Sequence, residues 1–133
     1  MPRIDEKQLQ RIFRSMGEPS WWVLSALAAS PDGLAPFQII RNVQQALTAA
    51  DYPIKRLDPA TLHYALPRMD ELGVIEFAGE RELDVPAGHG TTRTEKRPIW
   101  KITALGEHAL TRRQRMLQAV AMHRQLQPGM AVS

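Results

Sequence analysis

The twenty residues LDPATLHYALPRMDELGVIE, at positions 57–76, decide the fold of this 133-residue chain. Asp58 is a good N-cap and Pro59 suits the first helical position, so a helix is predicted to begin here. The apolar side chains that recur with helical spacing are Leu62, Leu66 and Met69. Gly73 ends the pattern. The helix is therefore expected to bury one face and to offer the other face outward.

Two strands separated by a long loop are predicted after this helix. Residues 74–85 have a strand-like pattern with an irregularity at Gly79, and residues 98–103 are the expected antiparallel partner. Between them lies PAGHGTTRTEKR, residues 86–97, which is polar, glycine-rich and basic. A helix followed by a strand, a loop and a second strand is what a winged helix-turn-helix uses to read DNA.

Further helices are predicted before and after this unit. Residues 5–16 carry a single apolar stripe, and residues 21–30, which Ser20 would cap, are apolar nearly all round and are expected in the centre. A third helix is predicted over residues 36–50 and a last one from Thr103, its N-cap, to about residue 127. In the third helix the side chains expected to face inward are Phe37, Ile40, Val43 and Leu47.

The predicted fold is mainly α with a small antiparallel β-hairpin: a winged helix-turn-helix with N- and C-terminal dimerisation helices. A length of 133 residues suits one domain. The expected parts of this single domain, residues 1–133, are an N-terminal helix at 4–17, a winged-helix core at 20–103 and a C-terminal dimerisation helix at 104–127.

Composition and motifs argue against membrane, secreted and enzymatic classes. No apolar run approaches the roughly 18 residues of a membrane span, and acidic residues stand where a secretion signal would be apolar. The chain has no cysteine, which excludes disulfides and fits the cytoplasm. It has no phosphate-binding glycine loop, GxSxG or HExxH motif, and its four histidines lack metal-ligand spacing. We expect no catalytic residues, no cofactor and no metal.

Charge is unevenly distributed along the chain. Residues 1–90 hold nine Lys or Arg against twelve Asp or Glu, a net charge of −3, whereas residues 91–133 hold eight against two, a net charge of +6. Such asymmetry is expected of a surface that faces phosphates, although a run of basic residues can also be a solvated helix face. Charge alone leaves both interpretations open.

Three segments resemble the PadR-like bacterial transcriptional regulators. Residues 57–76 are similar to the recognition-helix signature of that family, which is of the type LSPGTLYPALxRLEEEGLIE. WKITALG at 100–106 is similar to the family's YRITxxG, and PFQI at 36–39 to its GYEI. The resemblance covers roughly residues 22–110. It implies a DNA-binding regulator, most often a repressor, in a family that includes members released from DNA by phenolic acids or hydrophobic drugs.

The recognition helix departs from the family pattern at three positions. His63 stands where the family usually has Tyr, Tyr64 where it has Pro, and Pro67 replaces an ordinary helix former. If Leu62 faces the core, steps of 100° per residue direct Tyr64 outward more directly than His63. Tyr64 is therefore the better candidate for entering a DNA groove.

Positions on the helix and in the loop suggest which residues contact DNA. We expect methyl contact with thymine from Ala60 and Thr61, and hydrogen bonding or packing from Tyr64. Cationic side chains would lie near the phosphate backbone or a narrow minor groove. The candidate DNA-contacting residues are Lys55, Arg56, Ala60, Thr61, Tyr64, Arg68, Arg93, Lys96 and Arg97.

A dimer and an effector site are also expected. The apolar stripes of the first and last helices need a partner, and a two-fold pair of recognition helices would match a palindromic double-stranded operator. The last helix could instead fold back on the first within one chain. The candidate dimer-interface residues are Leu9, Ile12, Phe13, Leu110, Met116, Leu117 and Val120. Trp21 and Trp22 are candidates for a pocket that takes a small hydrophobic or aromatic effector, although tryptophans in an apolar helix are more often core.

A non-DNA function remains as the alternative. Winged helices also serve as protein–protein interaction modules, and the fold alone does not select DNA as the partner.

Overall fold

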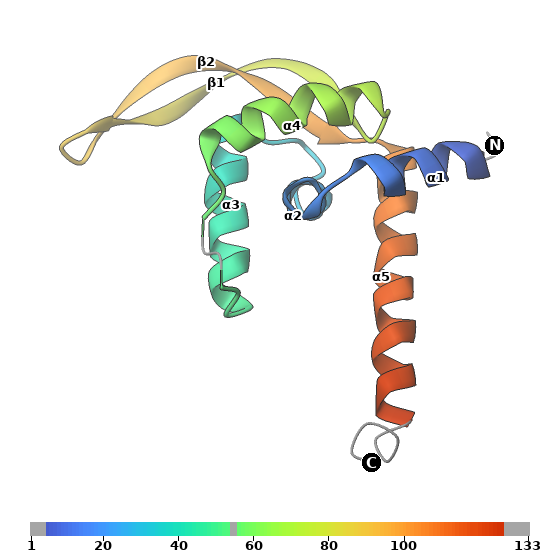
Figure 1. Cartoon of the computed structure of the whole chain (residues 1–133). Helices are drawn as coiled ribbons and strands as arrows, with labels where there is room; N and C mark the ends of the chain where they lie inside the picture. Colours follow the sequence, from blue (N-terminus) through green and yellow to red (C-terminus); the bar gives the residue numbers. More distant parts are fainter. Residues whose placement is uncertain (1–4, 54–55, 127–133) are drawn as a thin grey trace.

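The computed structural model describes residues 5–53 and 56–126 of the chain. Its elements, in chain order, are α1 (Glu6–Ser15), α2 (Glu18–Ala28), α3 (Pro36–Ala49), α4 (Pro59–Glu71), β1 (Ile75–Gly88), β2 (Thr91–Ile102) and α5 (Ala104–Leu126). Figure 1 shows α4 and the hairpin across one end of the molecule, with α3 and α5 running away from that end. None of the helices in the described part of the chain combines the length and apolar character of a membrane span.

The first two helices begin according to local capping chemistry. The Asp5 carboxylate accepts a hydrogen bond from the Lys7 amide at 2.9 Å and starts α1. The second helix starts at Glu18 with Gly17 as its N-cap, so the prediction that Ser20 caps it was wrong. Pro19 explains the difference, because its missing N–H costs nothing within the first helical turn.

The core is organised around α2. Val23, Leu24 and Leu27 are fully buried, and α2 contacts α3, α4, α5 and β2. This confirms the central position expected of a helix that is apolar nearly all round. In α3 the buried side chains are those of Ile39, Val43 and Leu47, one turn apart, whereas Phe37 and Ile40 are only half-buried. The inward face of α3 therefore differs from the prediction by a small rotation.

The capped helix forms as predicted. The Asp58 carboxylate accepts a hydrogen bond from the Ala60 amide at 3.2 Å, and Pro59 occupies the first helical position. Leu62, Leu66 and Met69 are the buried residues of α4. Pro67 lies inside the helix, which nevertheless continues to Glu71.

The hairpin differs from the prediction in its length. Residues 86–97, predicted as a long loop, belong almost entirely to the two strands, and only the two-residue turn His89-Gly90 joins them. Both turn residues have positive φ, at 50° and 76°, which is the conformation of a tight hairpin turn. The threonine-rich sequence after this turn suits a strand. The irregularity predicted at Gly79 is a bulge in the register between Phe77 and Glu80.

The base of the hairpin is fixed to the loop between α2 and α3. Leu34 and Trp100 exchange two backbone hydrogen bonds, of 3.0 and 2.9 Å. Gly33, with φ of +95°, precedes this bridge, and a Cβ at that position would lie 2.5 Å from Cγ2 of Ile99. Only glycine therefore allows the loop and β2 to approach this closely.

The start of α5 is fixed by Thr103, as predicted. Its hydroxyl accepts a hydrogen bond from the Gly106 amide at 3.0 Å and donates one to the Gly73 carbonyl oxygen at 2.5 Å. Gly106 is buried in the first turn of α5, and a Cβ there would lie 2.1 Å from the Val74 carbonyl oxygen. The two ends of the hairpin and the start of α5 are thus held together at one point.

We predict that Gly106→Ala destabilises the protein by about 3 kcal/mol or more, because the atom that must yield is backbone. Gly17→Ala is the matched control, since the nearest atom to its new Cβ lies at 3.7 Å. Urea denaturation of both variants measures the difference. Equal stability of the two variants would contradict the packing described for Gly106.

Candidate nucleic-acid interface

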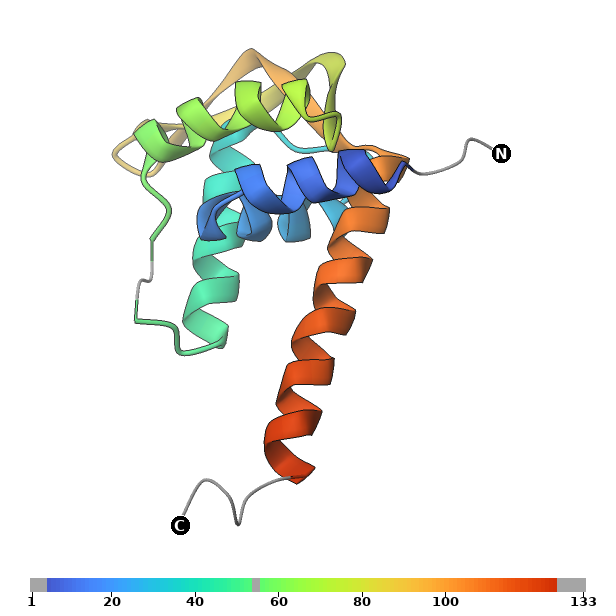
Figure 2. The same ribbon diagram turned by 45° about the vertical axis from the view of Figure 1, so that its right-hand side comes forward.

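The outer face of α4 is open to solvent. Tyr64 is the most exposed of the large hydrophobic side chains described, at 79% of its maximum, and Ala60, Pro67 and Arg68 are exposed along the same helix. Thr61 is half-buried. The His63 ring lies edge-on to that of Tyr64, with ring centroids 6.4 Å apart. In Figures 1 and 2, α4 lies on the outside of the molecule beside the hairpin.

The charge on α4 lies toward its C-terminal end. Residues 59–67 contain no Lys, Arg, Asp or Glu, and the charged side chains that follow are Arg68, Asp70 and Glu71, all exposed. The first nine residues of α4 therefore offer an uncharged surface of Ala60, His63, Tyr64 and Pro67. A duplex placed on this surface would meet side chains that read bases or pack against them, with Arg68 available for a phosphate.

The hairpin has two chemically different faces. Because alternate residues of a strand point to opposite sides, the cross-strand pairs assign each side chain to one face. One face, here called the inner face, is made by Arg81, Leu83, Val85, Arg93, Glu95 and Arg97. Val85 is buried, and Leu83, Glu95 and Arg97 are half-buried, so this face is turned partly toward the body of the protein.

The opposite side of the hairpin, here called the outer face, is acidic. It is made by Glu80, Glu82, Asp84, Pro86, Thr92, Thr94, Lys96 and Pro98. Lys96 is paired across the strands with Glu82, and the Thr94 hydroxyl donates to the Asp84 carboxylate at 2.9 Å. Lys96 therefore lies on a different surface from Arg93 and Arg97, although the three are close in sequence.

Folding cancels much of the charge asymmetry seen along the sequence. β1 carries four carboxylates and one arginine, whereas β2 carries four cations and one carboxylate, and the two strands are paired. On the inner face Arg93 and Arg97 both form ion pairs with Glu95. Arg81 donates to the Asp32 carbonyl oxygen at 3.0 Å. The hairpin as a whole is therefore balanced in charge rather than basic.

Two of the predicted DNA-contacting residues, Lys55 and Arg56, precede α4. Lys55 lies outside the described residues. Arg56 is exposed and lines, with Trp22, Leu47, Tyr52 and Leu57 among others, a hollow of about 180 Å³ between α2, α3 and the segment leading to α4.

The predicted dimer-interface residues divide into two groups. Leu9, Ile12 and Leu110 are buried in the core of the single chain, so the expectation that they await a partner was wrong for these three. Phe13 is half-buried and packs on Trp21, with ring centroids 5.4 Å apart. α1 therefore packs its stripe against the domain itself.

The far part of α5 keeps an uncovered apolar surface. Met116, Leu117 and Val120 are 53%, 53% and 50% exposed, and Met122 is exposed as well. They do not fold back on α1, and both views show the lower part of α5 projecting away from the other described elements (Figures 1 and 2). Exposed Met, Leu and Val side chains gathered on one helix are typical of an interaction surface.

The two adjacent tryptophans have different environments. Trp21 is buried, with the Arg113 guanidinium over its ring at 5.0 Å, and Arg113 pairs with Glu18 at 2.6 Å. Trp22 is half-buried and meets Tyr52 edge-on, with ring centroids 5.5 Å apart. A hollow of about 380 Å³ beside both tryptophans is lined by Glu18, Trp21, Trp22, Ser25, Tyr52, Leu110, Arg113, Gln114 and Leu117. Trp21 is therefore mainly core, whereas Trp22 is accessible.

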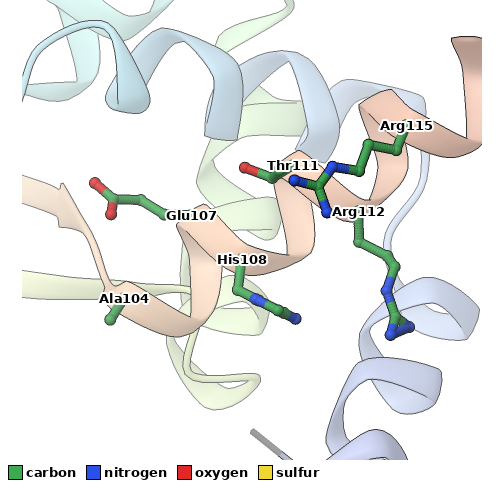
Figure 3. A pocket seen from close by; sticks show the side chains of 6 residues that line it. All are labelled: Ala104, Glu107, His108, Thr111, Arg112 and Arg115. Atoms are coloured by element: carbon green, nitrogen blue, oxygen red, sulfur yellow. The ribbon is translucent and has the colours of Figure 1, made fainter. Parts of the chain in front are cut away.

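A third hollow, of about 470 Å³, lies along the first turns of α5 and was not predicted. Its lining residues are Ala104, Glu107, His108, Thr111, Arg112 and Arg115, and Figure 3 shows their side chains pointing in different directions rather than toward one centre. Arg112 is already paired with Glu6 of α1, at 2.8 and 3.3 Å. This pair joins α5 to α1 and explains the arginine as a structural contact.

We predict that Tyr64→Ala leaves the free energy of unfolding within about 0.5 kcal/mol of the parent, because the removed ring is exposed. Leu62→Ala, two positions away and fully buried, is the contrasting change and should cost about 2–5 kcal/mol. Chemical denaturation of both variants measures this. A large loss of stability in Tyr64→Ala would show that the ring packs inside the protein.

Comparison with known proteins identifies the fold. No protein-family model and no curated protein matches the sequence. A PadR family transcription regulator from hypervirulent Clostridium difficile is similar in structure, with a TM-score of 0.53, 14% identity, and coverage of 83% of this chain and 97% of that chain. A transcriptional regulator from Clostridium thermocellum is similar with a TM-score of 0.55, 15% identity and coverage of 94% and 98%. The chain therefore has a winged-helix fold like that of these two transcription regulators, one of which is a PadR family protein.

Proposed function

We propose that this chain is a sequence-specific, DNA-binding transcriptional regulator that acts as a homodimer and represses by occupying an operator. The observation that carries the proposal is the free outer face of α4, with Tyr64 79% exposed, beside a long hairpin. The structurally similar proteins are transcription regulators, which supports a regulatory role rather than an enzymatic one.

The face of α4 suits the major groove of duplex DNA. A helix fits this groove, and the N-terminal part of a recognition helix usually meets the base edges. On α4 that part presents Ala60, Thr61 and Tyr64, whereas Arg68, one turn beyond Tyr64, is positioned for a phosphate. We assign base contacts to the first group and a backbone contact to Arg68.

The hairpin contributes phosphate contacts through the arginines of its inner face. Lys96 is surrounded by Glu80, Glu82 and Asp84, whose charges would repel a phosphate. Arg93 and Arg97 share a single carboxylate, that of Glu95, so a net positive charge remains there. We therefore place the DNA backbone near Arg93 and Arg97 and leave Lys96 outside the contact.

The direct test is fluorescence anisotropy with labelled duplex from the region upstream of the protein's own gene, compared with scrambled DNA, at roughly 50 to 200 mM salt. Tight binding that prefers the upstream duplex supports the proposal. Equal, weak binding to both duplexes would require a second screen with random duplex DNA, and failure in both would contradict a sequence-specific regulator.

The salt dependence should separate the two faces of the hairpin. We expect the double variant Arg93→Ala with Arg97→Ala to flatten the slope of log affinity against log salt by up to about two per protomer, because each lost phosphate contact releases about one fewer counterion. Lys96→Ala is the matched control and should leave the slope nearly unchanged. A flatter slope in Lys96→Ala alone would place the DNA on the outer face instead.

Dimerisation is assigned to the exposed stripe of α5. Side chains at 117, 120 and 121 share one side of the helix, and a second copy would cover the exposed Leu117 and Val120. A two-fold pair would also bring two α4 helices to one palindromic site. Leu9, Ile12 and Leu110 have no part in this interface, since each is buried within its own chain.

We predict that Leu117→Glu with Val120→Glu converts the protein from a dimer to a monomer of 15.0 kDa, because two carboxylates would be buried without partners. Size-exclusion chromatography with multi-angle light scattering measures the mass. Ala119→Glu adds one such carboxylate on the opposite side of α5 and should leave the dimer intact. A parent protein that is monomeric at high concentration would rule out the interface.

The second part of the proposal is that a small aromatic or hydrophobic effector relieves repression by releasing the protein from its operator. The hollow of about 380 Å³ beside Trp21 and Trp22 is also lined by Leu117. A ligand there would therefore touch both the core and the proposed dimer stripe. A flat aromatic ligand could stack or pack against these side chains. Binding at this position would couple the effector to the arrangement of the two protomers.

We expect titration with a phenolic acid to release labelled operator from the parent protein and to have little effect on Trp22→Ala. Anisotropy of the bound duplex measures release. Trp100→Phe, a change at a tryptophan outside the hollow, serves as the control. Release that is identical in parent and Trp22→Ala would place the effector elsewhere, and no release by any aromatic acid or hydrophobic dye would remove the effector from the proposal.

A protein-interaction module is the alternative function, and one observation favours it. The hairpin is balanced in charge, whereas a surface built for phosphates is usually strongly positive. If neither specific nor random duplex binds, the exposed faces of α4 and the hairpin become candidate protein-binding surfaces.

A further inference from the structure

The exposed side of α4, opposite the buried Leu62, is largely apolar. Steps of 100° per residue place Ala60, Tyr64 and Pro67 along one side of the helix, opposite Leu62. All three are exposed, whereas Leu62 is fully buried. Tyr64 and Pro67 are three residues apart and so are neighbours on the helix surface. Together Ala60, Tyr64 and Pro67 form what we call the apolar reading surface.

The polar groups available beside this surface are few. Among residues 59–67 there is no Arg, Lys, Asn or Gln, which are the side chains that form bidentate hydrogen bonds with guanine or adenine. The exposed hydrogen-bonding side chains are those of His63, which has two ring nitrogens, and Tyr64, which has one hydroxyl. The first nine residues of α4 therefore have no side chain for the commonest base-specific contacts.

The major groove has one apolar group that distinguishes bases, the C5-methyl of thymine. We infer, on the basis of the proposed function, that α4 selects thymine through this methyl group and that Tyr64 and Pro67 are the specificity-determining residues. Ala60 adds a further methyl contact one turn before Tyr64. Pro67, which lacks the backbone N–H that a helix interior uses, is then retained for its exposed ring rather than for helix stability.

The first experiment is selection of bound duplexes from a random DNA library by the full-length protein. An enriched palindromic site with thymine at fixed positions of each half is the expected result. Each of these thymines is then replaced by deoxyuridine, which pairs identically but lacks the methyl group. Loss of one buried methyl contact should weaken binding roughly three- to fivefold at the critical position in each half-site.

Protein variants assign the methyl contact to its side chains. Tyr64→Ala should bring the thymine-to-deoxyuridine affinity ratio close to one, whereas Tyr64→Phe should preserve the ratio because the ring remains. Arg68→Ala, at a proposed phosphate contact, should weaken both duplexes alike and leave the ratio intact. This is a double-mutant cycle between protein and DNA.

Pro67→Ala separates the reading role from a structural one. Replacing a proline inside a helix should raise the thermal midpoint. The same change should lower the thymine-to-deoxyuridine ratio, because the exposed ring is lost. Stability and discrimination would thus change in opposite directions, which loss of folding cannot produce.

The outcomes distinguish this inference from the proposed function. An enriched site without thymine, or one whose affinity is unchanged by deoxyuridine, overturns the inference and leaves a DNA-binding regulator standing. A methyl effect that persists in Tyr64→Ala and in Pro67→Ala also overturns it, since the methyl would then be read elsewhere. Failure to enrich any sequence overturns both the inference and the proposed function.

Discussion

The burial of α2 is the constraint on which the rest of the structure depends. Val23, Leu24 and Leu27 are fully buried, and each such side chain contributes about 1.5–3 kcal/mol. Three of them together match a large part of the 5–15 kcal/mol by which a typical domain is stable. Because α2 is apolar nearly all round, α3, α4, α5 and β2 must pack against it. That packing turns the Leu62 side of α4 inward and its Tyr64 side outward.

The distribution of charge makes the surface of the hairpin nearly neutral. The acidic β1 and the basic β2 are paired, so the hairpin has little net charge, and its three arginines lie on one face with Glu95 between two of them. Electrostatic attraction alone would then give only modest affinity for DNA. A DNA interface of the kind proposed would depend more on shape and apolar contact at α4 than on a strongly positive hairpin. The balance also explains why protein partners remain a serious alternative.

The sequence predicted what depends on local chemistry. Asp58 and Pro59 start α4, Thr103 starts α5, and the spacing of Leu62, Leu66 and Met69 gives the buried face correctly. Each of these signals acts within one or two turns of the chain. The order of the helices and strands that these signals mark along the chain predicted the winged-helix fold, and the structural comparisons confirm that fold.

Features that depend on contacts between distant segments were not predictable in the same way. Residues 86–97 look like a loop until the pairing of β1 with β2 places most of them in a hairpin. The separation of Lys96 from Arg93 and Arg97 depends on residues 91–97 forming a strand, and the burial of Leu9 and Ile12 depends on the position of α1 on the body. The sequence placed Tyr64 outward correctly because helix geometry alone determines that direction.

Amide hydrogen exchange of the full chain, with and without its selected duplex, tests most directly whether α4 and the hairpin together form the DNA-binding surface. The account predicts added protection in α4 and in the arginine-bearing part of β2, with the lower half of α5 unchanged. Protection confined to α5, or protection of the hairpin without α4, would contradict it.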